Sequence, residues 1–144
     1  LTGIFRTGEN PVVEIHAPAA LDEGFLWVMI VDNKGVVYHI VPNINDTEQR
    51  ISELGSVEGG VRRIRVLHPV SALAENPRLL AIRVDDGNYG KSEVIAIFSR
   101  SPLFDMRRPR DESVGSVAEA LEQELAGREN ELIGVAARVI DARP

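Results

Sequence analysis

The sequence has no cysteine, few aromatic residues and no long apolar run, and each absence excludes something. Without cysteine there are no disulfide bonds, thiolate nucleophiles or cysteine-based zinc sites. Aromatic side chains make up only 5% of the residues, which is a small supply for a carbohydrate-binding surface. The longest apolar run, Phe25 to Val31, has the length of a strand, whereas a transmembrane helix needs about 20 residues. We therefore expect no direct insertion into a membrane.

The charge balance and the length narrow the class of protein further. Twenty-two acidic against sixteen basic residues give a net charge of −6, which argues against nucleic acid as a partner. A chain of 144 residues fits a single domain with one core. The sequence starts at Leu1 and has no signal-like segment, so we expect a piece of a larger protein. Residues 1–10 are poorly patterned and predict a leader or linker, while residues 11–144 predict one domain.

About seven segments have the length and composition of β-strands. Two of them flank the turn Asp32 to Gly35 and predict a hairpin. Two others flank Gly87 to Gly90 and predict a second hairpin. In residues 61–67, Ile64 and Val66 alternate with arginines, as in a strand with one wet face. The predicted strands are 11–17, 25–31, 36–41, 61–67, 78–86, 92–99 and 131–141.

Only one helix is well indicated by the sequence. Ser116 and Glu119 have the spacing of a capping box, an apolar stripe follows, and Gly127 ends the pattern. Many short strands, regular turn signals and a single helix predict a mainly β fold. We expect an antiparallel β-sandwich of about seven strands with one short helix near the C-terminus.

No constellation of reactive residues is evident. The three histidines, His16, His39 and His68, are not at the spacing of a metal site, and no G-x-S-x-G motif occurs. We expect no enzymatic activity, no metal and no cofactor. His39 lies in an apolar strand, where a half-buried ring bonded to a backbone group is the favoured interpretation. The alternative is a ligand contact beside Trp27 and Tyr38.

Polar loops and an arginine-rich connector are the remaining candidates for a ligand or partner surface. The loop oxygens could bind Ca²⁺, but the same residues are common in tight turns. The arginines could capture a carboxylate or phosphate, or could simply be solvated and neutralised by Asp105, Asp111 and Glu112. With the aromatic and histidine candidates, the predicted surface comprises Trp27, Tyr38, His39, Asn43, Asn45, Asp46, Asp85, Asp86, Asn88, Tyr89, Arg107, Arg108 and Arg110.

Two stretches resemble a bacterial family of domains of unknown function. GFLWVMIVDNKGVVYHIVPN at residues 24–43 has its strand, D-x-x-G turn and strand ending in P-N. VIAIFSRSPLFDMRRPRDE at residues 94–112 is similar to its later strand with an S-x-x-P-L motif. The resemblance spans about residues 12–143 and implies a β-sandwich that follows serine/threonine kinase or caspase-like modules. The matching residues shape turns and a crossover, so no catalytic residue is implied: Asp32, Gly35, Pro42, Asn43, Ser99, Pro102 and Leu103.

These observations favour a non-catalytic binding or interaction module of a larger bacterial envelope or signalling protein. Its partner would be a protein or an unidentified ligand, and we expect a periplasmic or envelope-associated location in preference to the cytoplasm. Two alternatives remain open at this stage. One is a structural or assembly domain that pairs through a sheet edge such as residues 61–67, and the other is a carbohydrate-binding module. The sequence does not decide the oligomeric state.

Overall fold

The computed structural model describes residues 2–144 and confirms a mainly β fold with one α-helix. It has nine strands among the described residues, two more than the sequence indicates. Three short 3-10 helices, Ile51–Glu53, Val70–Ala74 and Glu129–Glu131, lie in the connections. The helix α1 is Val114–Leu125, and the strands are β1 Thr2–Arg6, β2 Val13–Pro18, β3 Phe25–Val31, β4 Val36–Val41, β5 Ser56–Glu58, β6 Val61–Leu67, β7 Gly90–Ser99, β8 Asp111–Ser113 and β9 Leu132–Arg143.

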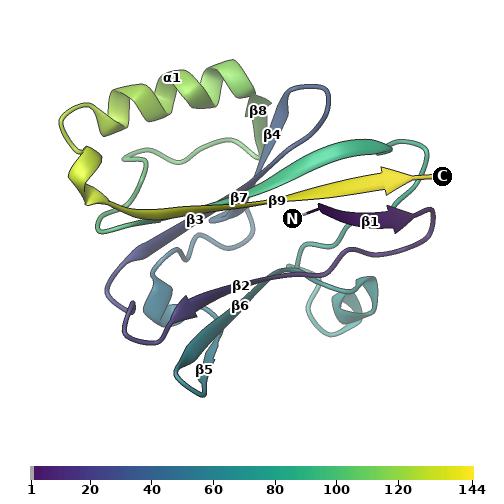
Figure 1. Cartoon of the computed structure of the whole chain (residues 1–144), viewed down its shortest axis with the longest axis horizontal. Helices are drawn as coiled ribbons and strands as arrows, with labels where there is room; N and C mark the ends of the chain where they lie inside the picture. The colour runs from purple at the N-terminus through teal and green to yellow at the C-terminus, as the bar shows by residue number, and fades with distance from the viewer. Residues whose placement is uncertain (1) are drawn as a thin grey trace.

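The strands form two sheets of unequal size (Figure 1). The larger sheet has the order β1-β9-β7-β3-β4-β8, and the smaller has the order β2-β6-β5. Every neighbouring pair is antiparallel except β1 and β9, which run parallel. None of the helices in the described residues is long and apolar enough to cross a membrane.

The large sheet is covered on both faces, which explains the continuous apolar run in β3. Leu26, Val28 and Ile30 pack with residues of the small sheet in one core cluster. Trp27 and Met29 point the other way and pack under α1 in a second cluster. A strand buried on both faces has no need of a polar alternation. Figure 1 shows the resulting layers, with α1 above the large sheet and β2, β5 and β6 below it.

The hairpin predicted around Asp32 to Gly35 is confirmed as β3 and β4. The Asp32 carboxylate accepts hydrogen bonds from the backbone nitrogens of Lys34 and Val36, both at 2.9 Å. Gly35 has φ +79°, in the left-handed region that favours glycine. Asp32 and Gly35, the two residues from which the turn was predicted, therefore also stabilise it.

The expectation that residues 1–10 are a leader or linker was wrong for most of this segment, although Leu1 itself lies outside the described residues. Thr2–Arg6 is strand β1, and its Ile4 lies opposite Asp141 in the parallel ladder with β9. Gly8 and Glu9 then exchange two backbone hydrogen bonds with Val84, each of 2.8 Å. Because β1 lies at the edge of the sheet, it carries little of the alternation by which a strand is recognised.

The second predicted hairpin was also wrong. Residues 90–99 form a strand, but β7 pairs with β3 on one side and β9 on the other. Both edges of β7 are therefore occupied, and residues 80–84 belong to no strand, although Val84 exchanges backbone hydrogen bonds with Gly8 and Glu9. The helix begins earlier than predicted, since Ser113 is the N-cap and its hydroxyl accepts from the Ser116 nitrogen at 3.1 Å.

Candidate functional site

A buried polar network joins the β3–β4 hairpin to α1. The Trp27 indole nitrogen donates a hydrogen bond of 3.0 Å to His39 Nδ1, and the two rings meet edge to face. An indole nitrogen can only donate, so His39 Nδ1 carries no proton and Nε2 must carry it. His39 Nε2 therefore donates to the Glu112 carboxylate at 2.6 Å. His39 is only 3% exposed, and its partners are side chains and not the backbone group expected from the sequence.

Glu112 is the centre of this network. Besides His39, it accepts hydrogen bonds from Arg108, whose Nε lies at 3.0 Å and whose Nη2 makes a second contact, and from the Ser116 hydroxyl at 2.7 Å. Burial raises the pKa of Glu112, but these donors outweigh burial and lower it to about 2. The hydrogen bond to Glu112 raises the pKa of Arg108. Glu112 is therefore a buried anion held by a cation and two neutral donors.

The state of His39 limits what it can do chemically. Burial lowers the pKa of His39, although the hydrogen bond to Glu112 acts in the opposite direction. Both ring nitrogens are engaged, so no lone pair is free to accept a proton from a substrate. The ring instead fixes the orientation of Trp27.

Next to this network lies a pocket of about 270 Å³, which we call the Trp27 pocket. Trp27 and Phe104 contribute aromatic surface to it, and their ring centroids are 4.7 Å apart. The guanidinium of Arg108 lies over Phe104, 5.3 Å from the ring centroid. Two loops complete the pocket, and its other lining residues are Pro42, Asn43, Thr47, Gln49, Asp105, Met106 and Arg107.

The Trp27 pocket has features that are unusual on an inert surface. Met106, which lines it, is 78% exposed, and Ile44 close by is 50% exposed. Arg107 connects the two loops, because its Nη2 donates to the Ile44 carbonyl at 3.4 Å. The buried Gln49 Oε1 has no hydrogen-bond partner among the described residues. A buried acceptor without a donor is costly unless a further group satisfies it.

A second hollow, the inter-sheet groove, lies on the opposite side of β4 and has a volume of about 420 Å³. Its walls are mainly apolar, and include Ile30, Leu67 and Ile140 from both sheets. Residues of the segment 80–84, which belongs to no strand, also line it. Four of the sequence-predicted residues line it, namely Tyr38, His39, Asn88 and Arg110.

The polar loops behave as turns. Asn43 Oδ1 accepts from the backbone nitrogens of Asn45 and Asp46, at 2.8 and 3.0 Å. Asp46 Oδ1 accepts from the Glu48 nitrogen at 3.1 Å. These oxygens are thus engaged by their own loop, which supports the turn interpretation over Ca²⁺ binding.

The loop around Asp85 is built in the same way. Asp85 Oδ1 accepts from the Gly87 nitrogen, and Asn88 Oδ1 accepts from the Asp85 nitrogen. Asp86 is exposed, and the Tyr89 hydroxyl is bonded to the Thr7 hydroxyl at 2.6 Å. Within residues 2–144, no group of three or more histidine, aspartate or glutamate side chains could hold a metal ion.

The structure separates the predicted arginine cluster into different roles. Arg108 is neutralised by Glu112, and Arg110 is paired with Asp111 at 3.3 Å on an exposed surface. Arg107 is exposed at the Trp27 pocket. The predicted candidates are therefore not one site: Trp27, Asn43, Arg107 and Arg108 meet at the Trp27 pocket, and the groove collects four others.

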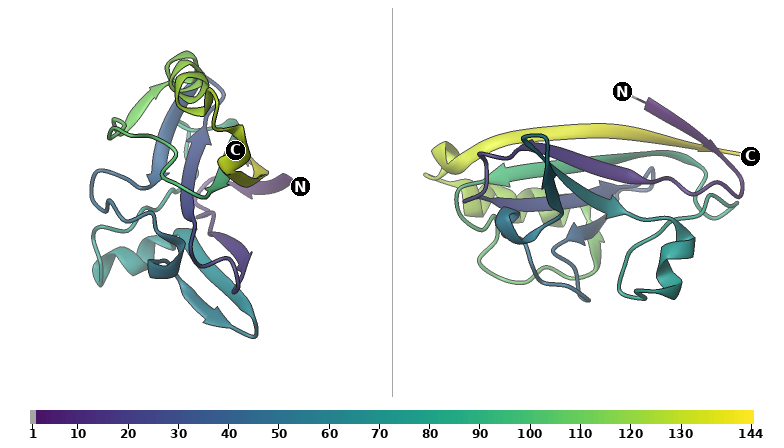
Figure 2. Two further views of the ribbon diagram at one scale, coloured as in Figure 1. Left: turned by 90° about the vertical axis from the view of Figure 1, so that its left-hand side faces the viewer. Right: turned by 90° about the horizontal axis from the view of Figure 1, so that it is seen from below.

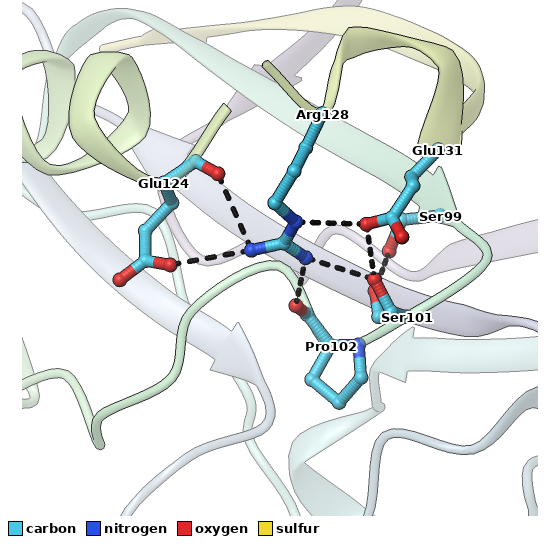
Figure 3. A network of polar contacts seen from close by, with 6 residues as sticks. All are labelled: Ser99, Ser101, Pro102, Glu124, Arg128 and Glu131. Atoms are coloured by element: carbon cyan, nitrogen blue, oxygen red, sulfur yellow. Dashed lines mark hydrogen bonds and ion pairs between the residues drawn. The ribbon is translucent and has the colours of Figure 1, made fainter. Parts of the chain in front are cut away.

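One polar network escaped the sequence analysis (Figure 3). Arg128 donates to Glu131 at 2.8 Å, to the Ser101 hydroxyl at 2.8 Å and to the Pro102 carbonyl at 3.3 Å. Ser101 in turn donates to Glu131 at 2.6 Å, and Arg128 also donates to the Glu124 carbonyl at 3.2 Å, so the connector after β7 is tied to the end of α1. In the sequence, the i, i+3 spacing of Arg128 and Glu131 was the one feature that could have indicated this network. Because the guanidinium of Arg128 donates its hydrogen bonds to groups of the same chain, we assign this network a structural role.

Comparison with known proteins gives no further indication of what this site does. No protein-family model, no curated protein and no solved structure matches this chain.

Proposed function

We propose that this chain is a non-catalytic interaction module of the β-sandwich type, and that it binds a partner protein through the Trp27 pocket. The observation that carries the proposal is the set of residues gathered there. Aromatic residues, methionine and arginine are the types enriched at protein interfaces. Met106 and Arg107 are exposed at the pocket, and the nearly buried rings of Trp27 and Phe104 line its apolar base beside Arg108. The wider setting, a bacterial envelope or signalling protein, follows from the resemblance of residues 24–43 and 94–112.

The form of the pocket suggests what it would accept. Its aromatic side is small and apolar, which suits one apolar anchor side chain of a partner. The exposed Met106 is flexible and would cover the bound side chain. This arrangement binds a ligand without needing a reactive group.

The alternatives have less support. A carbohydrate-binding surface requires exposed aromatic rings, but Trp27 and Phe104 are 3% and 5% exposed and Tyr38 reaches only 36%. Catalysis by His39 would need a free ring nitrogen, and both are engaged. The inter-sheet groove supports a second candidate function, the binding of a small apolar molecule, because its volume lies in the range of ligand cavities.

A peptide selection with a built-in reporter tests the main proposal. Peptides are selected against the chain from a random phage-displayed library, and binding is followed by the fluorescence of Trp27, the only tryptophan. Met106→Lys should weaken the selected peptides by roughly tenfold or more, as expected for loss of an interface contact. Val57→Lys, at an exposed valine on β5, is the matched control and should leave the affinity unchanged.

Two results would contradict the proposal. One is a failure to enrich any peptide. The other is enriched peptides that bind Met106→Lys as tightly as the unaltered chain. A fluorescent fatty acid as a second probe separates the candidates, because it should enter the inter-sheet groove and be insensitive to Met106→Lys.

A further inference from the structure

Strand β9 of the large sheet is paired along its length on one side but only along part of its length on the other. On its β7 side, β9 is paired along its length, from Leu132 opposite Ser99 to Ala142 opposite Gly90. On its other side, β1 pairs only with Val139 to Arg143. Among the described residues, the outer side of Leu132 to Arg138 therefore has no strand beside it. Figure 2 shows β1 next to only the C-terminal part of β9. We call residues 132–138 the open edge.

The open edge lacks the usual protection of an edge strand. Natural sheet edges are blunted by charged residues, proline or bulges, because unpaired backbone groups attract other strands. Residues 132–137 read LIGVAA and contain neither charge nor proline, and Arg138 is the only charged residue of the edge. The bulge in this ladder lies at its end, between Phe98 and Ser99. Backbone groups in the middle of the edge are thus available.

The side chains on the open edge are also apolar and uncovered. Val135 is 62% exposed and Ile133 is 38% exposed. Val135 lies opposite Ile97 on the face that carries α1, but it is not among the residues packed under the helix. The other sheet edges differ in charge, since β8 contains Asp111 and Glu112 and β5 contains Glu58. Among the described strands, β1 also has a largely uncharged outer edge, with Arg6 as its only charge, but the uncharged run of the open edge, residues 132–137, is longer.

Gly134, in the middle of the open edge, has no explanation within the chain. It does not have a positive φ, and a Cβ placed there would meet no atom within 4 Å. Neither its backbone conformation nor the packing around it requires glycine. Glycine within a strand commonly marks a place where another backbone comes close.

We propose that the open edge pairs antiparallel with the open edge of a second copy of this chain, forming a two-fold dimer with one continuous sheet. The choice of a second copy follows from charge and symmetry. About a two-fold axis at Val135, Ile133 lies opposite Ala137 and Leu132 lies opposite Arg138, so no like charges meet. The two Val135 side chains become neighbours and lose exposed apolar surface. This proposal is independent of the Trp27 pocket.

Light scattering coupled to size-exclusion chromatography of the full chain tests this inference. The mass should rise with concentration from 15.8 kDa toward twice that value. Val135→Lys and Val135→Glu should each weaken the dimer by roughly tenfold or more, because each places like charges opposite each other across the axis. Val12→Lys, at an exposed valine away from the open edge, should associate like the unaltered chain. Circular dichroism checks that each variant is folded.

The decisive sample is an equimolar mixture of the Val135→Lys and Val135→Glu chains. Opposite charges then face each other across the axis, and the mixture should regain the dimer mass. Amide hydrogen exchange of residues 132–138 should slow as the unaltered chain dimerises. A monomer at every concentration, a dimer unaffected by Val135→Lys, or a mixture that stays monomeric would each overturn the proposal.

Discussion

Replacement of Glu112 by glutamine should destabilise the fold strongly at neutral pH and progressively less in acid. Glutamine has the size of a protonated glutamate but cannot carry the charge that Arg108 needs. His39 can still donate to the new amide oxygen, whereas one Arg108 donor then faces the amide NH₂ group. The substitution therefore removes mainly the charge and leaves most of the packing intact.

The magnitude follows from the pKa of Glu112. Folding lowers this pKa from 4.5 to about 2, and the side chain is only 6% exposed, so little of the effect is screened by solvent. At 1.36 kcal/mol per pKa unit, the charged form adds about 3 kcal/mol to the free energy of unfolding. Because the folded pKa is the lower one, the unfolded chain takes up the proton first. The contribution is present above pH 4.5 and is lost as the pH falls toward 2.

Urea unfolding followed by Trp27 fluorescence measures this effect. At neutral pH the Glu112→Gln chain should unfold at a urea midpoint lower by roughly 1 to 2 M. Below pH 4.5 the two curves should converge. His39 also loses stability in acid, since burial lowers its pKa. The Glu112 carboxylate opposes this lowering, so the loss from His39 is larger in the Glu112→Gln chain and shifts the convergence of the two curves toward lower pH. Glu119→Gln, at an exposed position on α1, is the control and should change the free energy by less than about 0.5 kcal/mol.

The reasoning would be refuted by a difference between the two chains that is the same at every pH. Such a result would mean that glutamine disturbs packing or hydrogen bonding and that the charge of Glu112 contributes nothing. A loss below about 1 kcal/mol at neutral pH would contradict it equally, because it would imply a pKa close to that of a free carboxyl group.

Three further predictions concern backbone and capping, and thermal or urea unfolding measures each. Gly55→Ala should lower the free energy of unfolding by several kcal/mol, because a Cβ there would lie 2.0 Å from the Arg63 carbonyl oxygen. Gly59→Ala, with a similar φ but open space around it, should lower it by only about 1 kcal/mol. Equal losses for the two variants would contradict the clash at Gly55. Ser113→Ala should cost about 0.5 to 2 kcal/mol by removing the N-cap of α1, and no loss would show that the cap is dispensable. Gly134→Ala should stabilise the chain by roughly 0.5 to 1 kcal/mol, and a loss would mean that glycine is required there after all.

Local patterns predicted the elements whose causes are local. The β3–β4 hairpin was predictable because Asp32 and Gly35 fix the turn between two apolar runs. Strand β6 has the bounds that its alternation indicated, residues 61–67. It is, however, the middle strand of the small sheet, and not a free sheet edge of the kind that the assembly alternative assumed for residues 61–67.

Distant pairings were not predictable in the same way. Residues 78–86 have the composition of a strand, but whether they become one depends on a free edge, and β3 and β9 already occupy both sides of β7. The candidate site shows the same limit. The sequence placed His39 near Trp27 across a hairpin, but Glu112, their common partner, comes 73 residues after His39. Only the folded chain brings these groups together.

The parallel pairing of β1 with β9 has a consequence for how the chain folds. The two strands come from opposite ends of the described residues, and β9 must form before β1 has a partner. During synthesis on the ribosome, β1 therefore waits until nearly all of residues 2–144 have been made. A ladder with such a large loop to close is slow to form. The β3–β4 hairpin can assemble early, while closure of the large sheet is a late event in folding.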